Sequence, residues 1–404
     1  MSLPLSSRHE TFFLFTLAGI QFTHILDFMI MMPLGPLLIE AFGIDTQAFG
    51  LLVASYTLSA GTASLLVATF IDRFERKKLL LVVFFLFGAS TLACGLAASY
   101  PALLVARGLS GTFGGVMGAM VQTMIGDVIP YSRRARASGL VAAAFSVSTV
   151  AGVPVSLWLA NHLQWRTPFL LTAALTGIVM LPALRTLPEL RQHIHHKKPA
   201  HAFSTMFMVL SDFNHIKTLI YSTLIIFSGF TVIPYITLYA VHNVGIAQFD
   251  IPIVYLVGGT ATLFSSQLIG RWADRRGKVE VYRRLALATT IPLLVVTHVS
   301  SATLPIWILC TTTFFVLVSG RMIPAITIIT AAAQPGLRGT FMSLNATAQS
   351  LAMGAATLLT GFVVGQESGG QIVGYAQVGY IAVLSNLMAI WFVGHITIHD
   401  QHRS

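Results

Sequence analysis

The segment Gly270-Arg-Trp-Ala-Asp-Arg-Arg-Gly-Lys278 has a counterpart in Ala68-Thr-Phe-Ile-Asp-Arg-Phe-Glu-Arg-Lys77. The aspartates of the two segments, Asp72 and Asp274, lie 202 positions apart, which is half of the 404 residues. The same offset, to within one residue, relates two further pairs: Arg136 with Arg338, and 28–33 with 230–234. The chain therefore consists of two related halves, an arrangement typical of secondary transporters.

The composition indicates that lipid surrounds these halves. Only 9% of the residues are charged, 55% are hydrophobic and the mean hydropathy is +0.78. A soluble domain carries about 25% charged residues. This composition excludes a soluble enzyme, a nucleic-acid-binding domain and a disordered protein.

Long apolar runs predict twelve transmembrane helices of about 20 residues each. The predicted spans are 11–37, 46–70, 78–98, 101–128, 137–160, 165–186, 216–242, 250–272, 281–300, 304–330, 339–364 and 372–397. The predicted fold class is an all-α membrane protein of two pseudo-symmetric six-helix bundles. The bundles comprise 1–187 and 215–404, with a cytoplasmic linker over 188–214.

The basic residues predict the orientation. All but three of the 24 Lys and Arg residues fall on the loops and tails of one side; the exceptions are Arg107, Arg166 and Arg321. Because cytoplasmic loops carry the positive charge, both termini are predicted to be cytoplasmic. The net charge of +10 thus reflects topology and not an anionic partner.

Neither a disulfide nor a metal site is predicted. Cys94 and Cys310 both lie in apolar runs. The linker histidines His193, His195 and His196 are weak evidence for a metal, and we expect none. The short segment 203–210 in the linker predicts a surface helix.

The two repeated loops resemble the signature loop of the major facilitator superfamily, and the resemblance covers the whole chain. The first copy departs from that pattern at Ala68 and Glu75, where glycines are usual. Arg107-Gly-Leu-Ser-Gly111 resembles the family's R-x-x-Q-G element, with Ser110 in place of Gln. Gly152-Val-Pro154 resembles the Gly-Pro hinge of the family's antiporter motif, without its trailing glycine pair. Three further segments resemble the arabinose-efflux-permease branch of drug–proton antiporters: Trp165 to Phe169, Gly320 to Pro324, and Arg338 to Asn345.

Asp27 is the only acidic residue deep inside a predicted span. A charge at the bilayer centre costs about 2.5–3.5 kcal/mol, so Asp27 is expected to face a cavity or a partner. Burial favours the neutral acid, which makes reversible protonation possible. Gln21, His24 and Asp27 share roughly one helical face. We interpret this face as a site for a proton or a substrate cation; a structural carboxylate tied to a neighbouring helix is the alternative.

Two arginines also lie within spans. By resemblance, Arg107 is the span-four arginine implicated in proton coupling, and it needs a partner such as Asp27 or a backbone carbonyl. A purely structural Arg107 remains the alternative. Arg321 lies nearer the cytoplasmic end of span ten, where it contacts an anionic substrate group or, as we favour, snorkels to the headgroups.

By resemblance, the charged loops form a cytoplasmic gate. The expected gate residues are Asp72, Arg73, Arg76, Asp127, Asp274, Arg275 and Lys278. Asp72 would face the start of span eleven, Arg76 would bridge to Asp127, and Asp274 would act against span five. Topogenic charge alone is the alternative, but it does not explain the matching aspartates.

Small residues predict close helix packing in the first half. Gly111 and Gly115 in span four provide small-x-x-x-small spacing. Gly152 and Pro154 in span five are expected to bend that helix and to pack it against span four. A hinge role for them rests on the family resemblance.

These features predict a secondary active transporter of a small organic solute, most probable as a proton-coupled exporter of a drug or sugar-like compound. Proton-coupled uptake or uncoupled facilitation of a polar solute is the alternative. A non-transporting membrane receptor or scaffold is a hypothesis of another class. We expect no enzymatic activity and no cofactor beyond the proton gradient. The partners would be the solute, protons and the lipid bilayer, with the protein a monomer in a bacterial inner membrane.

Overall fold

The computed structural model describes residues 7–67, 74–189, 202–334, 336–367 and 369–398. Within these residues the chain is almost entirely helical. The first half contains α1 (Ser7–Ile30), α2 (Gly35–Phe42), α3 (Thr46–Val67), α4 (Arg76–Leu96), α5 (Tyr100–Val128), α6 (Tyr131–Val147), the π-helical turn η2 (Ser148–Gly152), α7 (Val153–His162) and α8 (Thr167–Thr186).

The second half begins with the linker helix α10 (Ala202–Ser211), which agrees with the predicted surface helix. The elements that follow are α11 (Phe213–Phe230), η3 (Ile233–Tyr235), α12 (Ile236–Tyr239), η4 (Ala240–Val244), η5 (Gln248–Asp250), α13 (Ile251–Arg276), α14 (Lys278–His298), α15 (Leu304–Gly320), α16 (Met322–Ala332), α17 (Arg338–Val363), β1 (Gly365–Gln366), β2 (Ile372–Val373) and α18 (Tyr375–Val393). The strands β1 and β2 form one antiparallel pair.

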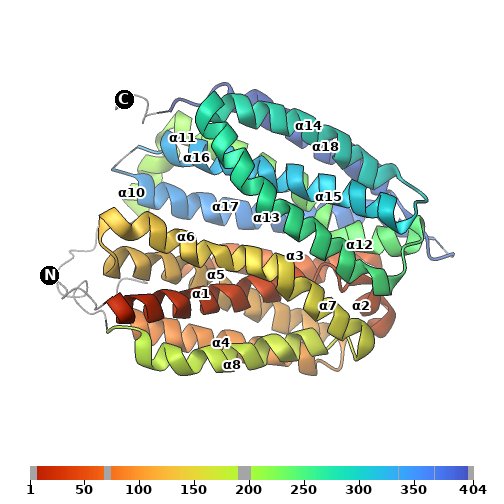
Figure 1. The fold of residues 1–404 in the computed structure, drawn as a ribbon, viewed down its shortest axis with the longest axis horizontal. Coiled ribbons are helices and arrows are strands. Elements are labelled where there is room, and N and C mark those ends of the chain that lie inside the picture. Colours follow the sequence, from red (N-terminus) through yellow and green to blue (C-terminus); the bar gives the residue numbers. More distant parts are fainter. Residues whose placement is uncertain (1–6, 68–73, 190–201, 335, 368, 399–404) are drawn as a thin grey trace.

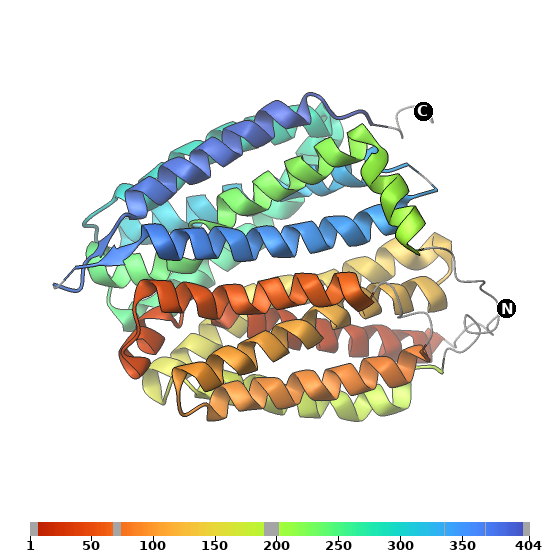
Figure 2. The same cartoon turned by 180° about the vertical axis from the view of Figure 1, so that it is seen from behind.

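The helices lie in two layers, with α1 to α8 in one and α11 to α18 in the other (Figures 1 and 2). The layers are joined mainly where α3 packs along α17 and where α7 with η2 packs on α13. The start of α1 and the end of α18 lie at the same end of the molecule (Figure 1), which we call the terminal end. The opposite end, with α2, η4 and the strands, is the distal end.

Eleven helices among the described residues are long and apolar enough to cross a membrane. The helix α14 is the twelfth spanning element by position, and it carries four charged residues at its start: Lys278, Glu280, Arg283 and Arg284. These charges lower its apolar character at the terminal end. The predicted twelve-helix membrane fold is confirmed.

Prolines interrupt several spans. The first span is not the single helix over 11–37 that the sequence predicts, because a turn over 31–34 separates α1 from α2. Pro33 lies in that turn, Pro234 lies in the 3₁₀ turn η3, and Pro154 follows the π-helical turn η2. A proline cannot donate the backbone hydrogen bond that a continuous helix requires.

Glycines bring α5 against α3. A Cβ atom at Gly111 would overlap the backbone carbonyl of Tyr56, and one at Gly115 would overlap that of Ala60. One turn further on, Gly118 has no atom within 4 Å of its Cβ position. Two of the three glycines therefore determine how closely the helices approach.

The packing of Gly152 differs from the expectation. A Cβ there would lie 2.8 Å from a methyl carbon of Leu26 and 3.6 Å from the ring of Phe22, both on α1. The π-helical turn therefore packs on α1, and not on span four as the sequence suggested. Pro154 is buried directly after this turn.

The linker and the second half are joined at the terminal end by Asp212, the residue before α11. Its Oδ1 accepts the backbone N–H of His215 at 2.9 Å, and its Oδ2 accepts the Nε2 of Gln334 at 2.6 Å. The buried ring of His215 contacts the Val209 carbonyl of α10 at 3.3 Å and accepts the backbone N–H of Gln334 at 3.1 Å. This cluster ties α10, α11 and the segment after α16 together.

Three expectations lie outside the described residues. They concern Asp72 and Arg73 of the first signature loop, and the linker histidines His193, His195 and His196.

We predict that Gly111→Ala lowers the thermal unfolding midpoint of the detergent-purified protein. The added Cβ meets backbone atoms that cannot rotate away, and such overpacking costs about 1–3 kcal/mol. The matched control is Gly118→Ala on the same helix, which is expected to be neutral or stabilising because alanine favours helices by up to about 1 kcal/mol. Equal midpoints for the two variants would contradict the packing account.

A second prediction concerns acid sensitivity at Asp212, just outside the membrane-spanning segment. Burial alone raises the pKa of this carboxyl, but the hydrogen bonds from His215, Asn214 and Gln334 bring the pKa below its ordinary value. A depressed pKa means that the carboxylate stabilises the folded state above the unfolded pKa. That stabilisation is lost as the pH falls through the folded pKa.

Asp212→Asn keeps a capping oxygen but does not titrate. Its unfolding midpoint is therefore expected to fall less than that of the wild type between neutral and acidic pH. Asp212→Ala also removes the cap and is expected to cost about 1 kcal/mol at neutral pH. Parallel pH profiles for the wild type and Asp212→Asn would show that this carboxylate has no such role.

Candidate functional site

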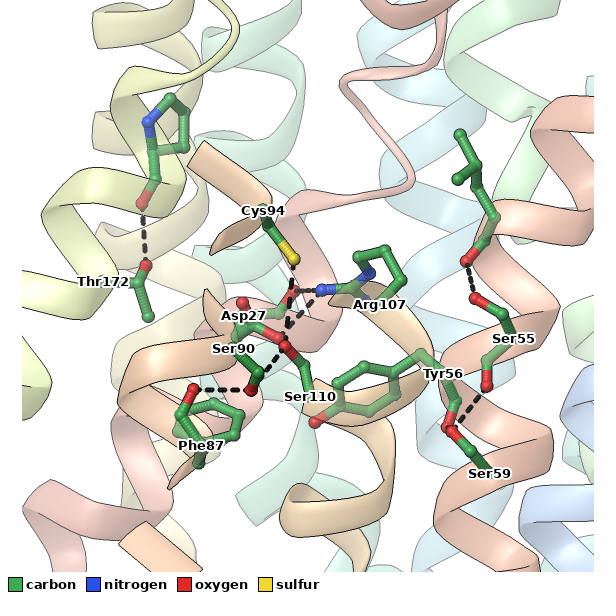
Figure 3. Close-up of polar contacts among 12 residues, drawn as sticks. Asp27, Ser55, Tyr56, Ser59, Phe87, Ser90, Cys94, Arg107, Ser110 and Thr172 are labelled. Atoms are coloured by element: carbon green, nitrogen blue, oxygen red, sulfur yellow. Dashed lines mark hydrogen bonds and ion pairs between the residues drawn. The ribbon is translucent and has the colours of Figure 1, made fainter. Parts of the chain in front are cut away.

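A buried ion pair lies in the middle of the first bundle. The guanidinium of Arg107, on α5, donates from Nη1 to the Oδ2 of Asp27, on α1, at 2.8 Å. The same nitrogen lies 3.3 Å from the backbone carbonyl oxygen of Asp27. Both side chains are inaccessible to solvent, and Figure 3 shows them pointing toward each other. The structure thus brings together two residues that the sequence singled out separately.

Aromatic rings cover the guanidinium. The ring centroid of Tyr56, on α3, lies 4.5 Å from Cζ of Arg107, and that of Phe169, on α8, lies 6.0 Å away. A cation over the face of an aromatic ring is stabilised electrostatically, and more strongly where water is excluded. Arg107 is therefore held by an acid and by π-faces from two other helices.

Several polar atoms in this region are buried and have no hydrogen-bond partner among the described residues. They are Oδ1 of Asp27, Nδ1 of His24, the hydroxyl of Tyr56, Oγ1 of Thr91 and Nε of Arg107. A buried polar atom without a partner costs about 1–3 kcal/mol. Such a cluster is suited to accept a proton or a polar ligand, because either one would satisfy these atoms.

A chain of small polar groups continues from the pair along α4 and α5. Sγ of Cys94 lies 3.8 Å from Oγ of Ser110, which donates to Oγ of Ser90 at 3.1 Å. Ser90 in turn donates to the carbonyl oxygen of Phe87 at 2.8 Å (Figure 3). Ser110, which stands where the family element has Gln, therefore links α5 to α4.

His24 and Gln21 do not contact Asp27 directly. The ring of His24 lies 6.3 Å from that of Tyr56 and 6.2 Å from that of Phe87, centroid to centroid. Gly114 leaves room for His24 and the Tyr56 hydroxyl to approach each other, since a Cβ there would overlap both. Gln21 is half-buried, and no hydrogen bond of its side chain to another described residue is present. His24 therefore lies next to Tyr56, the residue that covers Arg107, and not next to Asp27 itself.

The expected gate residues are only partly assembled among the described residues. Nε of Arg76, at the start of α4, lies 2.5 Å from Oδ2 of Asp127, at the end of α5. Asp274, near the end of α13, pairs with Lys278, the first residue of α14, at 2.7 Å, and Arg275 is exposed. Each pair lies within one bundle, so neither pair joins the halves.

Arg321 does not snorkel to the membrane surface, which corrects our expectation. It lies between α15 and α16 and is fully buried. Nη1 donates to Oδ1 of Asn386, and Nη2 lies 3.2 Å from the Ile225 carbonyl oxygen and 3.4 Å from Oγ of Ser228. Helices α11 and α18 supply these partners, so tertiary packing determines the position of this side chain.

The two halves meet at the centre and at the distal end. At the centre, the rings of Phe28 and Phe230 stack with 6.0 Å between their centroids. At the distal end, the Tyr235 hydroxyl donates to the Thr46 carbonyl at 2.8 Å, and the Thr46 hydroxyl donates to the Val364 carbonyl at 2.6 Å. A pocket of about 480 Å³ also opens at this end, between α2, η4 and η5.

No sequence pattern indicated that Tyr56, Ser90 and Cys94 are neighbours of the ion pair. Tyrosine, serine and cysteine are common in apolar helices, and their positions alone do not show which face of a helix meets an arginine. The internal repeat of 202 residues does not identify these neighbours either, because the second half has no buried ion pair among its described residues.

Known proteins resemble the chain along most of its length. A D-xylose–proton symporter shares the fold with a TM-score of 0.78 over 99% of this chain and 100% of that one, at 15% identity. A bacterial homologue of the human lysosomal transporter Spinster, in an inward-facing and unoccupied conformation, has a TM-score of 0.74 at 17% identity, over 96% and 97% of the chains. At such identities these likenesses show the fold alone.

Curated relatives are similar in sequence. A probable sugar efflux transporter of Mannheimia succiniciproducens is 23% identical over 88% of this chain and 86% of its own length. The vacuolar membrane amino acid uptake transporter fnx2 of Schizosaccharomyces pombe is 31% identical, over 35% of this chain and 24% of its own length. The first four curated relatives are matched over only 24–42% of their lengths.

The family model of the Major Facilitator Superfamily matches residues 17–357, which is most of the chain. This match agrees with the twelve-helix fold and the two repeated halves. The chain belongs to the Major Facilitator Superfamily, whose members are multi-pass membrane transporters of small solutes.

Proposed function

We propose that the protein is a proton-coupled exporter, an antiporter, with Asp27 as its protonation site. The observation that carries this proposal is the buried Asp27–Arg107 ion pair, in which Oδ1 of Asp27 remains without a partner. A carboxylate with a free oxygen can take up a proton without first losing its place in the bundle.

Protonation changes the charge balance of the first bundle. With Asp27 ionised, its charge and that of Arg107 cancel; with Asp27 neutral, the guanidinium remains as an uncompensated buried cation. Leaving one partner of a buried pair alone costs about 3–5 kcal/mol. That cost favours a rearrangement in which Arg107 finds another partner. Proton binding and the conformation of the bundle are therefore coupled.

The transport cycle would move the two bundles against each other. Separation of the Phe28 and Phe230 rings would connect the Asp27 region to the space between the halves. The Arg76–Asp127 pair would hold the terminal ends of α4 and α5 together while this happens. We assign the terminal end to the cytoplasm of a bacterial inner membrane, in agreement with the basic loops, and we take the transporter to act as a monomer.

The direction of transport is supported by a relative that matches 88% of this chain and is described as a probable sugar efflux transporter. A drug or sugar-like compound is therefore our first choice of substrate. Uptake, coupled or uncoupled, is the second candidate, because another relative is described as an amino acid uptake transporter. A receptor or scaffold is disfavoured by the buried polar atoms around Asp27, which a non-transporting protein would replace with apolar side chains.

The first prediction tests Asp27 directly. A thermal-shift screen of candidate solutes at two pH values identifies a solute that binds. With that solute, proteoliposomes containing the wild type are expected to couple its export to proton movement under an imposed pH gradient. Asp27→Asn is expected to reduce both fluxes to the level of empty liposomes, because an amide cannot take up the proton.

Asp27→Glu is the matched control, since it keeps a titrating carboxyl and is expected to retain coupled transport. If Asp27→Asn exports as fast as the wild type and still moves protons, Asp27 is not the protonation site. Accumulation of the solute in cells instead of its loss would favour the uptake alternative.

The second prediction concerns the ring over Arg107. Tyr56→Phe keeps the π-face and removes a hydroxyl that has no partner among the described residues, so its stability is expected to match the wild type. Tyr56→Leu removes the cation–π contact, which is worth up to about 2 kcal/mol where water is excluded. Its unfolding midpoint and its coupled flux are expected to fall. Equal effects of the two substitutions would contradict this role of the ring.

A further inference from the structure

The buried guanidinium of Arg321 has no carboxylate partner among the described residues. Its donors reach Asn386, the Ile225 carbonyl and Ser228, all of which are neutral. The side chains of Tyr221 and Tyr282 also lie near the guanidinium, and both are neutral when protonated. Neutral partners satisfy N–H groups, but they do not cancel a buried charge.

The internal repeat shows where a carboxylate is missing. Phe28 and Phe230 lie 202 positions apart and stack on each other between the halves. The residue before Phe28 is Asp27, and the residue before Phe230 is Gly229. The position that carries an acid in one bundle therefore carries no side chain in the other.

The position that a Cβ atom of residue 229 would occupy faces Arg321. A Cβ built there lies 3.9 Å from Nη2 of Arg321, 3.4 Å from a methyl carbon of Val318 and 3.7 Å from one of Ile233. All three are ordinary contacts, so a carbon atom fits without displacing its neighbours. A short group with a negative end, placed at this point, would reach the guanidinium.

A buried donor of Arg321 itself has no partner. Its Nε makes no hydrogen bond among the described residues, whereas the buried hydroxyls of Tyr221 and Tyr282 lie close enough to interact with each other. The two tyrosine rings pack edge to face, with 5.1 Å between their centroids. Donors of this kind around a cation are suited to hold an anion.

The geometry points to a binding site for one small anionic group at Arg321, beside Gly229. The ligand chemistry is a single negative charge of carboxylate size, from an organic acid or from a small inorganic anion such as chloride. The site lies next to Phe230, whose ring stacks on Phe28 of the other half. The inference does not depend on proton coupling at Asp27 or on the direction of transport.

The test uses the full-length protein purified in detergent. Its unfolding midpoint is measured while sodium acetate or sodium chloride is added, with the ionic strength held constant by a bulky sulfonate salt. The wild type is expected to gain several degrees and to reach a plateau, as mass action requires for a ligand that binds only the folded state.

The decisive variant is Gly229→Asp, which supplies the missing carboxylate from the chain itself. Without added anion it is expected to unfold at a higher temperature than the wild type, and added acetate or chloride is expected to give no further plateau. Gly229→Asn is the matched control of similar size, and it is expected not to reproduce this stabilisation because it carries no charge.

A plateau with acetate alone assigns the site to organic carboxylates, and a plateau with chloride assigns it to small inorganic anions. Absence of a plateau in the wild type with either salt overturns the inference, as does an equal plateau in Gly229→Asp. The readout is the anion dependence of unfolding, and not proton or solute flux, which separates a failure of this site from a failure of the proposed protonation site.

Discussion

The buried ion pair between Asp27 and Arg107 is the interaction on which the first bundle depends. Two opposite charges survive there because each satisfies the other and because aromatic rings cover the cation. The glycines of α5 make this possible, since Gly111 lets α3 approach until the backbone of Tyr56 touches α5. That approach places the Tyr56 ring over Arg107. The close packing of α3 on α5 and the stabilisation of the buried cation therefore depend on the same contacts.

The second bundle repeats the fold without repeating this chemistry. At the offset of 202 residues, Asp27, Tyr56 and Arg107 correspond to Gly229, Gly258 and Leu309. The buried cation of the second bundle is Arg321, further along its helix, and its partners are neutral. A duplicated scaffold therefore carries two different buried charge arrangements. The first is balanced within the chain, whereas the second is complete only with an added negative charge.

Much of the fold could be predicted from the sequence, because lipid imposes long apolar helices and loop charges report topology. The breaks in the spans were harder to place. Pro33 marks a turn, but prolines are also tolerated inside spanning helices. Gly152 was expected on span four and packs on α1, because a small residue permits close packing on any neighbouring helix. The signature loop departs from the family at Glu75, and there the structure shows a helix cap, with Glu75 accepting the backbone N–H groups of Lys77 and Lys78.

The candidate site was predictable only in part, and the reason is geometric. The scarcity of charge singled out Asp27, Arg107 and Arg321, since lipid excludes unpaired charges. Which of them pair depends on the rotation of each helix about its axis, which no single-sequence pattern determines. Arg321 was expected at the headgroups, yet α11 and α18 bury it. Tyr56 and Cys94 carry no charge and so gave no signal at all.

The central claim is that Asp27 takes up a proton while it remains buried beside Arg107. Infrared difference spectroscopy of the reconstituted protein tests it most directly, because a protonated carboxyl has its own C=O stretching band. On acidification across the pH range in which transport operates, the wild type is expected to gain such a band that is missing in Asp27→Asn. Identical difference spectra for the two proteins would show that Asp27 does not titrate there, and the account would fail.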